Sequence, residues 1–286
     1  MAKSPYISIM RSLVVFTILC IYSSSAFSTN KLVGQHGMQT RTSTSLNFFG
    51  MGGGGSAGAK TGVPTSYEEV HKQAVAAVGA AIKKGEKKME VEFPPLAALN
   101  KLGDGSAKSA KMIKEANAEF AKKLVTSLTS SRSKVWVVCC EPGYKKMLEE
   151  AIGTQNKKVE VVPLSSRNLP DASPKDVLIF LTPGDDSQWK IAAKLGETAP
   201  VVVVNGLFNN GYGALEPVYY LKPFSGWGYL MRQFPNDFTV YLTGEKKPLD
   251  LKVTMMEMGN LRRPDSTVVG KVLQSEFMNR AGKQRK

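Results

Sequence analysis

Short runs of β-branched and other apolar residues alternate with helical segments between residues 134 and 204, and this alternation constrains the fold more than any other feature. The runs 177–181 and 201–204 are continuously apolar, as are strands buried on both faces of a parallel sheet. Strands that alternate with helices build a mainly parallel sheet flanked by helices, so we expect an α/β, Rossmann-like fold. The expected strands are 134–140, 159–162, 176–181 and 200–204, with helices over 144–152 and 185–195.

The segments before and after this region extend the prediction. Ser66 and Glu69 form a capping box for a helix that stops at Gly85, and a strand over 89–93 and a helix over 106–128 follow. Beyond the last parallel strand, short apolar runs lie too close together for crossover helices, which predicts antiparallel C-terminal strands at one side of the sheet. These runs are 218–221, 238–242 and 251–254, with an aromatic segment over 224–234, and a final helix is expected over 265–280.

The first 60 residues differ in composition from the rest, since they contain five basic residues and no acid. Lys3 and Arg11 precede an apolar run over 13–22 and small residues over 23–26, which is the pattern of a signal peptide. The run is about half as long as the roughly 20 apolar residues that a membrane-spanning helix needs, so an anchor is the less favoured alternative. The hydroxyl-rich, acid-free segment after Phe27 is typical of a transit peptide.

The junction at Ala26 and Phe27 resembles the cleavage motif of plastid precursors in algae with complex plastids. This leader predicts a protein of the plastid stroma or of the stromal face of the thylakoid. We also expect no transmembrane span in the mature chain. We expect a signal peptide over 1–26, a transit peptide over 27–50, a glycine-rich linker over 51–62, a single α/β domain over 63–261, and a basic C-terminal helix and tail over 262–286.

The formal charge of +14 would favour nucleic acid or an anionic membrane as a partner if it were spread over the domain. Residues 61–286 carry 33 basic and 24 acidic residues, or +9, and the segment from Arg262 onward contributes +5 of this. The sequence lacks the aromatic and basic pattern of RNA-binding sheets, so nucleic acid is not an expected partner. The tail is suited to peripheral thylakoid contact or to an acidic partner, and a solvated tail is the commoner alternative.

Cysteine and histidine are too few for several kinds of chemistry. After residue 60 the only histidine is His71, which we interpret as a solvated side chain on a charged helix start, and the only cysteines are Cys139 and Cys140. Neighbouring strand residues point to opposite faces, so a disulfide between these two is disfavoured, and no zinc spacing is present. Glycine-rich nucleotide motifs are also missing. We therefore expect no catalytic triad, no metal and no cofactor, and assign no catalytic residue.

Polar residues follow several expected parallel strands, and ligands in such sheets bind beyond the carboxyl ends of the strands. These residues therefore define one candidate crevice, where residues 182–184 would present backbone donors to an anion. Ordinary turn and capping chemistry is the alternative for each residue taken singly, because Asp185 suits a helix N-cap and Asn205 with Gly206 suits a turn. The candidate ligand-binding residues are Glu92, Glu141, Asp185, Asp186 and Asn205.

Six short motifs, taken together in their order and spacing, resemble a known family. The chain is similar over about residues 63–245 to the plastid domain of unknown function numbered nineteen-ninety-five. No catalytic residue is implied by this resemblance. The motifs are 63–67 ahead of an alanine-rich helix, 91–95, 176–183, 201–205, 218–223 and 232–235.

The resemblance implies a family that includes the low photosystem II accumulation protein three of plants, which helps assemble photosystem II by acting on its chlorophyll-binding core antenna subunit. A similar domain is fused to a plastid adenylate kinase, but this chain has no kinase phosphate loop, so that activity is not implied. We therefore expect a non-catalytic plastid accessory or assembly factor whose partners are photosystem II subunits or assembly factors. The alternative is a small-molecule or nucleotide-related enzyme or binding protein that uses the crevice.

Overall fold

The computed structural model describes residues 62–95, 107–141, 143–153, 155–165, 169–207, 215–250, 255–258 and 261–283. The predicted signal peptide, the predicted transit peptide and nearly all of the predicted glycine-rich linker lie outside these residues, as does the expected strand over 251–254. Among the helices that are described, none is long and apolar enough to cross a membrane.

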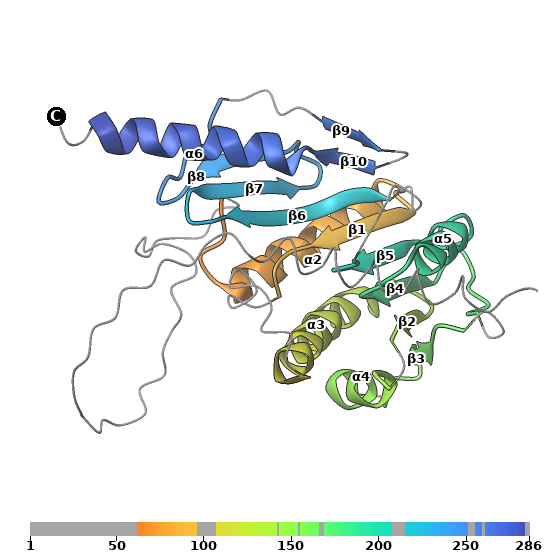
Figure 1. The fold of residues 1–286 in the computed structure, drawn as a ribbon. Coiled ribbons are helices and arrows are strands. Elements are labelled where there is room, and N and C mark those ends of the chain that lie inside the picture. The colour runs from red at the N-terminus through yellow and green to blue at the C-terminus, as the bar shows by residue number, and fades with distance from the viewer. Residues whose placement is uncertain are drawn as a thin grey trace, which may run out of the picture. The chain divides into compact units, whose positions relative to one another are not determined.

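The expected α/β fold is confirmed, with an eight-stranded mixed sheet at its centre (Figure 1). The strands are β1 (Lys88–Glu92), β2 (Val135–Cys139), β3 (Val159–Pro163), β4 (Val177–Leu181), β5 (Val201–Val204), β6 (Glu216–Phe224), β7 (Gly228–Gln233) and β8 (Thr239–Leu242). Their order in the sheet is β3-β2-β4-β5-β1-β6-β7-β8. Neighbours from β3 to β6 are parallel, and antiparallel C-terminal strands lie at one edge of the sheet, as predicted. The run over 218–221, expected among the antiparallel strands, lies in β6, which is antiparallel to β7 but parallel to β1.

The aromatic segment contains a strand that the sequence analysis did not predict. β6 turns into β7 through a short loop in which Trp227 N donates to Phe224 O over 2.7 Å. Ser225 and Gly226 both adopt positive φ, 43° and 80°, which glycine tolerates and which a tight turn between antiparallel strands requires. The expected strand over 218–221 is therefore one part of a longer hairpin.

Helices cover both faces of the sheet. On one face lie α2 (Tyr67–Lys83), α3 (Ala107–Leu128) and α4 (Lys145–Ile152); on the other lie α5 (Asp186–Leu195), α6 (Ser266–Lys283) and a hairpin of β9 (Met255–Met258) and β10 (Leu261–Pro264) (Figure 1). Side chains of β5 alternate between the two cores, since Val202 and Val204 join the first and Val201 and Val203 the second. The continuous apolar run over 201–204 therefore correctly predicted a strand that is buried on both faces.

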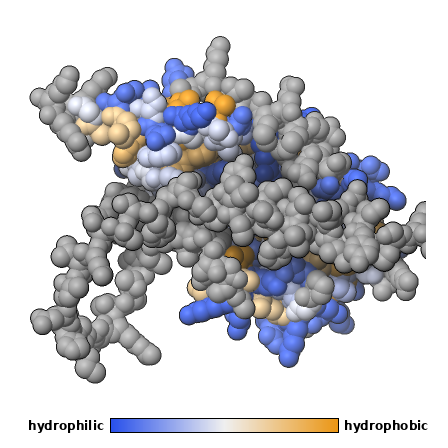
Figure 2. All heavy atoms as spheres, in the orientation of Figure 1, coloured by the Kyte–Doolittle hydropathy of each residue, from blue (hydrophilic) through white to orange (hydrophobic). Residues whose placement is uncertain are grey.

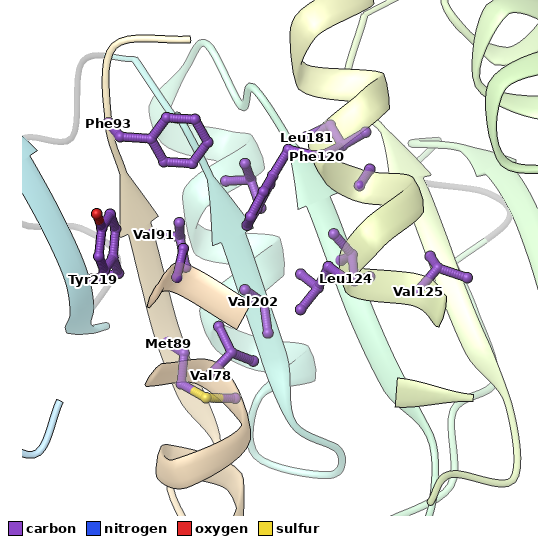
Figure 3. Close-up of a cluster of buried hydrophobic side chains, with 14 of the residues drawn as sticks. Val78, Met89, Val91, Phe93, Phe120, Leu124, Val125, Leu181, Val202 and Tyr219 are labelled. Carbon is purple, nitrogen blue, oxygen red and sulfur yellow. The ribbon is translucent and has the colours of Figure 1, made fainter. Parts of the chain in front are cut away.

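The larger core lies between the sheet and α2 and α3. Figure 3 shows Val78 of α2 beside Met89 of β1, and Phe120 and Leu124 of α3 over Leu181 and the neighbouring strand. Each of these side chains is essentially inaccessible to solvent. Burial of an apolar side chain of this size contributes about 1.5–3 kcal/mol, so this cluster is the main source of stability for the first face.

The interpretation of His71 as a solvated residue is wrong. Its side chain is 8% exposed and packs against Phe93 and Phe120, with ring centroids 5.7 Å and 5.3 Å apart. The charged residues around it in the sequence lie on the outer side of α2, while His71 faces the aromatic cluster. Burial lowers the pKa of His71 from 6.5 to about 4, and the nearby charge of Lys123 adds to this effect.

We expect His71 to make the stability of the fold depend on pH. Because the pKa is about 4 in the fold and 6.5 in the unfolded chain, the unfolded chain binds the proton first as the pH falls. The contribution of neutral His71 is complete above pH 6.5 and is lost as the pH falls towards 4. Relative to His71→Phe, the wild type should lose about 1–2 kcal/mol of unfolding free energy between about pH 7 and pH 5 in urea titrations. Parallel pH profiles of the two proteins would contradict this assignment.

Candidate functional site

The carboxyl ends of β2, β4, β5 and β1 are neighbours in the sheet, and the five predicted site residues all lie at this edge. Glu141 follows β2, Asp185 and Asp186 follow β4, Asn205 follows β5, and Glu92 ends β1. Topology therefore brings these residues to one edge, as expected for a sheet of parallel strands. Their side chains, however, form bonds with different parts of the protein.

Hydrogen bonds of the Asn205 side chain connect the end of β5 to the residue after β1 and to α3. Its Oδ1 accepts a hydrogen bond from Phe93 N over 2.9 Å, and its Nδ2 donates to Asn117 Oδ1 over 2.7 Å. The side chain is 8% exposed, so both bonds lie inside the protein. Its φ of 47° is a left-handed conformation that asparagine adopts more readily than most residues. Asn205 thus acts as a structural clamp across three elements.

Thr182 and Glu141 are next to each other at the ends of β4 and β2. The Thr182 hydroxyl lies 3.4 Å from Glu141 Oε1, and the other carboxylate oxygen of Glu141 lies 2.5 Å from Lys114 Nζ. Thr182 has a φ of 50°, which is strained for a β-branched residue, and its N–H donates to Val204 O over 2.9 Å. Lys114 of α3 therefore neutralises the acid that the sequence placed in the crevice.

Asp185 is the N-cap of α5. Its Oδ1 accepts from the Ser187 hydroxyl over 2.5 Å, from Gln188 N over 3.0 Å and from Ser187 N over 2.9 Å, and these bonds, the hydroxyl bond most of all, lower the pKa of the carboxyl. Asp186 begins the helix, where a negative charge is favourable to the helix dipole. The backbone donor Gly184 N is already bonded to Gln188 Oε1 over 2.7 Å. The alternative interpretation of Asp185 as a helix cap is thus confirmed. The N–H of Gly184, which was expected to donate to an anion, donates to a side chain of the same turn instead.

We expect Asp185→Ala to lower the unfolding free energy by about 0.5–2 kcal/mol, because two N–H groups of α5 lose their acceptor. Asp185→Asn should lose much less, since the amide oxygen can still cap the helix. Asp186→Ala is the matched control and should change stability by no more than about 0.5 kcal/mol. Chemical denaturation of the three variants measures these differences. An Asp186→Ala loss equal to that of Asp185→Ala would contradict the assignment.

Cys139 and Cys140 are buried on opposite faces of the sheet, in the first and second core respectively, as the strand geometry predicted. Both are free thiols. Burial raises the pKa of each thiol above its ordinary value, which keeps both protonated and unreactive. Within the described ranges, no three His, Cys, Asp or Glu side chains gather as a metal site requires.

A buried ion cluster lies on the second face of the sheet, and the sequence analysis missed it. Glu90 of β1 is 2% exposed and accepts a hydrogen bond from Arg263 of β10. The other guanidinium nitrogen, Nη1, lies 2.7 Å from Glu92 Oε2, and Arg263 stacks over the Tyr220 ring at 5.5 Å. Burial raises the pKa of Glu90 to about 7; the charge of Arg263 opposes this shift and that of Glu92 adds to it.

Arg262, the neighbouring arginine of β10, also attaches the hairpin of β9 and β10 to the sheet. Arg262 Nη1 lies 3.4 Å from Glu216 of β6, and Glu216 also pairs with Arg232 of β7 over 2.6 Å. The pair Arg262 and Arg263, which we interpreted as the start of a basic tail, is therefore part of a strand bound to acids of the sheet. Glu92, proposed for the crevice, belongs to this cluster.

The aromatic residues of the segment over 224–234 are mainly core residues. Tyr229 is 8% exposed and packs in the first core, and Phe234 is half-buried against the same cluster. Phe224 and Trp227 pack against the third cluster, beneath α6. This segment supports the hairpin and the final helix.

Comparison with family models matches residues 64–260 to the "Domain of unknown function (DUF1995)". None of the curated proteins compared with the chain matches it. The matched segment contains the whole of the eight-stranded sheet, and it covers more than half of the 286 residues. The chain therefore belongs to the DUF1995 family.

Proposed function

We propose that this protein is a plastid accessory or assembly factor that binds a partner and catalyses no reaction, and that photosystem II is the assembly it serves. The observation that carries the non-catalytic part is the engagement of the carboxyl-edge side chains. Glu141, Asp185 and Asn205 each bond to groups of the fold itself. The edge that commonly holds the reacting groups of an α/β enzyme is here occupied by structural contacts.

The groups that often carry nucleophilic or acid–base chemistry support the same proposal. Both thiols are buried with raised pKa values, so neither is a ready nucleophile. His71 is buried among aromatic rings with a pKa of about 4, well below the range that suits a general base at neutral pH. A binding role needs none of these groups in a reactive state.

The proposed plastid location and the proposed role in photosystem II assembly rest on the sequence. The acid-free leader with its Ala26–Phe27 junction is the argument for the plastid, and membership of DUF1995 is consistent with the resemblance to a photosystem II assembly protein. On the face shown in Figure 2, hydrophilic residues dominate the described surface and apolar ones are scattered among them. A contact made and released during assembly suits such a surface.

The test is complementation of a line that lacks the protein. The full chain should restore photosystem II to normal amounts, and a tagged full chain should recover photosystem II subunits from isolated plastids. A chain without residues 1–50 should fail to restore them. Glu141→Gln, which alters the half-exposed acid of the crevice and leaves the clamp and the cap intact, should restore them as well as the wild type.

Three outcomes would overturn the proposal. Normal photosystem II in the line that lacks the protein, with no subunit recovered on the tagged chain, would exclude the assembly role. Full complementation by the chain without residues 1–50 would exclude the plastid address. Failure of a folded Glu141→Gln protein to complement would indicate that the crevice carries out chemistry.

A further inference from the structure

A cavity of about 590 Å³ opens at the amino ends of β2, β3 and β4, on the edge of the sheet opposite the carboxyl-edge residues. The described residues that line it are three basic residues, three serines and one proline. The basic residues are Arg132, Lys158 and Lys175, and the serines are Ser130, Ser131 and Ser133. No acidic residue is among the described residues that line it.

The three cations come from three neighbouring strands, whose backbones hold them in place. Arg132 precedes β2, Lys158 directly precedes β3, and Lys175 precedes β4, and the order β3-β2-β4 puts Arg132 in the middle. Lys158 O accepts from Val135 N over 2.7 Å, and Lys175 O accepts from Ser133 N over 3.1 Å. The positive charges are therefore brought together by the register of the sheet before any ligand arrives.

The charge in this cavity lacks a counter-charge from the described part of the chain. Neither Arg132 nor Lys175 forms an ion pair with a described acid, and Arg132 Nε is buried without a hydrogen-bond partner there. Lys158 Nζ donates to the carbonyl of Thr129 over 3.3 Å. The acids nearest in sequence are already bonded, since Glu160 pairs with Lys134 over 2.5 Å and Asp176 accepts from Ser173 N over 2.9 Å.

A second cavity, of about 460 Å³ at the amino ends of β1 and β6, shows the contrast. Its basic residues face acids that also line it: Lys88 pairs with Glu197 over 3.7 Å, and Arg262 pairs with Glu216 over 3.4 Å. The acidic residues that line that cavity therefore neutralise its basic residues. The excess of positive charge therefore distinguishes the cavity beside Arg132 from this second cavity.

We propose that the cavity beside Arg132 binds a small phosphate-bearing molecule of the sugar-phosphate class. Three cations more than neutralise the charge of about −1.5 to −2 that a phosphate monoester carries at pH 7, and guanidinium and ammonium donors suit its oxygens. The hydroxyls of Ser130 and Ser131 already donate to Ser127 O and Leu128 O, so the cations carry the recognition. The volume falls within the roughly 300–1,000 Å³ of small-ligand sites, so it accommodates more than the phosphate itself. Among the described residues of the lining, Pro174 is the one apolar residue and none has an aromatic ring that could stack on a nucleotide base. This site is independent of the proposed assembly role.

Isothermal titration calorimetry on the full chain at low salt tests the site. Inorganic phosphate and glucose 6-phosphate should bind, glucose should not, and added salt should weaken the binding. Lys175→Gln should raise the Kd for glucose 6-phosphate about tenfold, and Arg132→Gln with Lys175→Gln should raise it further. Lys146→Gln, which removes an 87% exposed lysine of α4, is the matched control and should leave Kd within about twofold.

Several results would overturn the proposal. These are no binding of either phosphate compound up to about 10 mM, equal binding of glucose, or an equal loss in Lys146→Gln. Tighter binding of ADP than of glucose 6-phosphate would overturn the sugar-phosphate class. Binding to phosphatidylglycerol vesicles without binding of the soluble esters would identify a lipid headgroup as the source of the phosphate and would also overturn it. Lys175 is exposed and lies before its strand, so this variant remains informative if the Arg132 variant fails to fold.

Discussion

Replacement of Arg263 by methionine is expected to lower the unfolding free energy by about 3–5 kcal/mol. The variant leaves Glu90, which is 2% exposed, inside the protein without its opposite charge. Arg262→Met is the matched control on the same strand: its side chain is 75% exposed, and its loss should cost no more than about 1 kcal/mol. Urea unfolding at about pH 8 measures both.

The pH dependence of this loss separates charge from packing. Burial raises the pKa of Glu90 to about 7, against 4.5 in the unfolded chain, so the folded protein takes up this proton first as the pH falls. Neutral Glu90 needs no counter-charge. The cost of Arg263→Met should therefore shrink between about pH 8 and pH 5. Glu90→Leu combined with Arg263→Met should recover most of the stability, and a double variant as unstable as Arg263→Met would contradict the ion-pair explanation.

Asn205→Ala is expected to lower the unfolding free energy by about 3 kcal/mol or more. The change leaves Phe93 N without its acceptor and Asn117 Oδ1 without its donor, and both groups are buried. It also places a Cβ-bearing residue without a stabilising amide at a φ of 47°. Thermal and urea unfolding with the wild type as reference measure the loss.

Asn205→Gly divides this effect into its two causes. Glycine adopts positive φ without strain but makes neither side-chain bond, so Asn205→Gly should be more stable than Asn205→Ala by about 1 kcal/mol and still well below the wild type. Equal stability of the glycine variant and the wild type would show that the amide bonds contribute nothing. In that case the assignment of Asn205 as a clamp would be wrong.

The parallel part of the fold could be predicted because its strands are buried on both faces. Continuous apolar runs such as 177–181 and 201–204 have no other stable place in a domain of this size, and their bounds agree with β4 and β5 to within one residue. β7 was missed since the segment over 224–234 was described only as aromatic, with no strand assigned to it. The order of the strands could not be predicted, because β1 pairs with β5 and β6, which lie far along the chain.

The sequence predicted where the candidate site residues lie, but not which groups their side chains bind. Strand ends identify Asn205 and Glu141, but their partners Asn117 and Lys114 come from α3, and no local pattern indicates such contacts. Glu90 was missed for a related reason. In the strand Met89–Glu92 the acids alternate with apolar residues, which is typical of a strand with one solvated face. The residue that covers that face, Arg263, is 173 positions away.

The place of β1 in the sheet also determines when the protein can fold during its synthesis. β1 is the first of the described strands to be made, yet both its neighbours, β5 and β6, are made more than a hundred residues later. The nascent chain therefore holds an unpaired strand until most of the domain has left the ribosome, a topology of high contact order that folds slowly. Glu90 stays hydrated for longer still, because the hairpin that carries Arg263 is made after all eight strands of the sheet. Closing the acid inside the protein is thus a late event of folding.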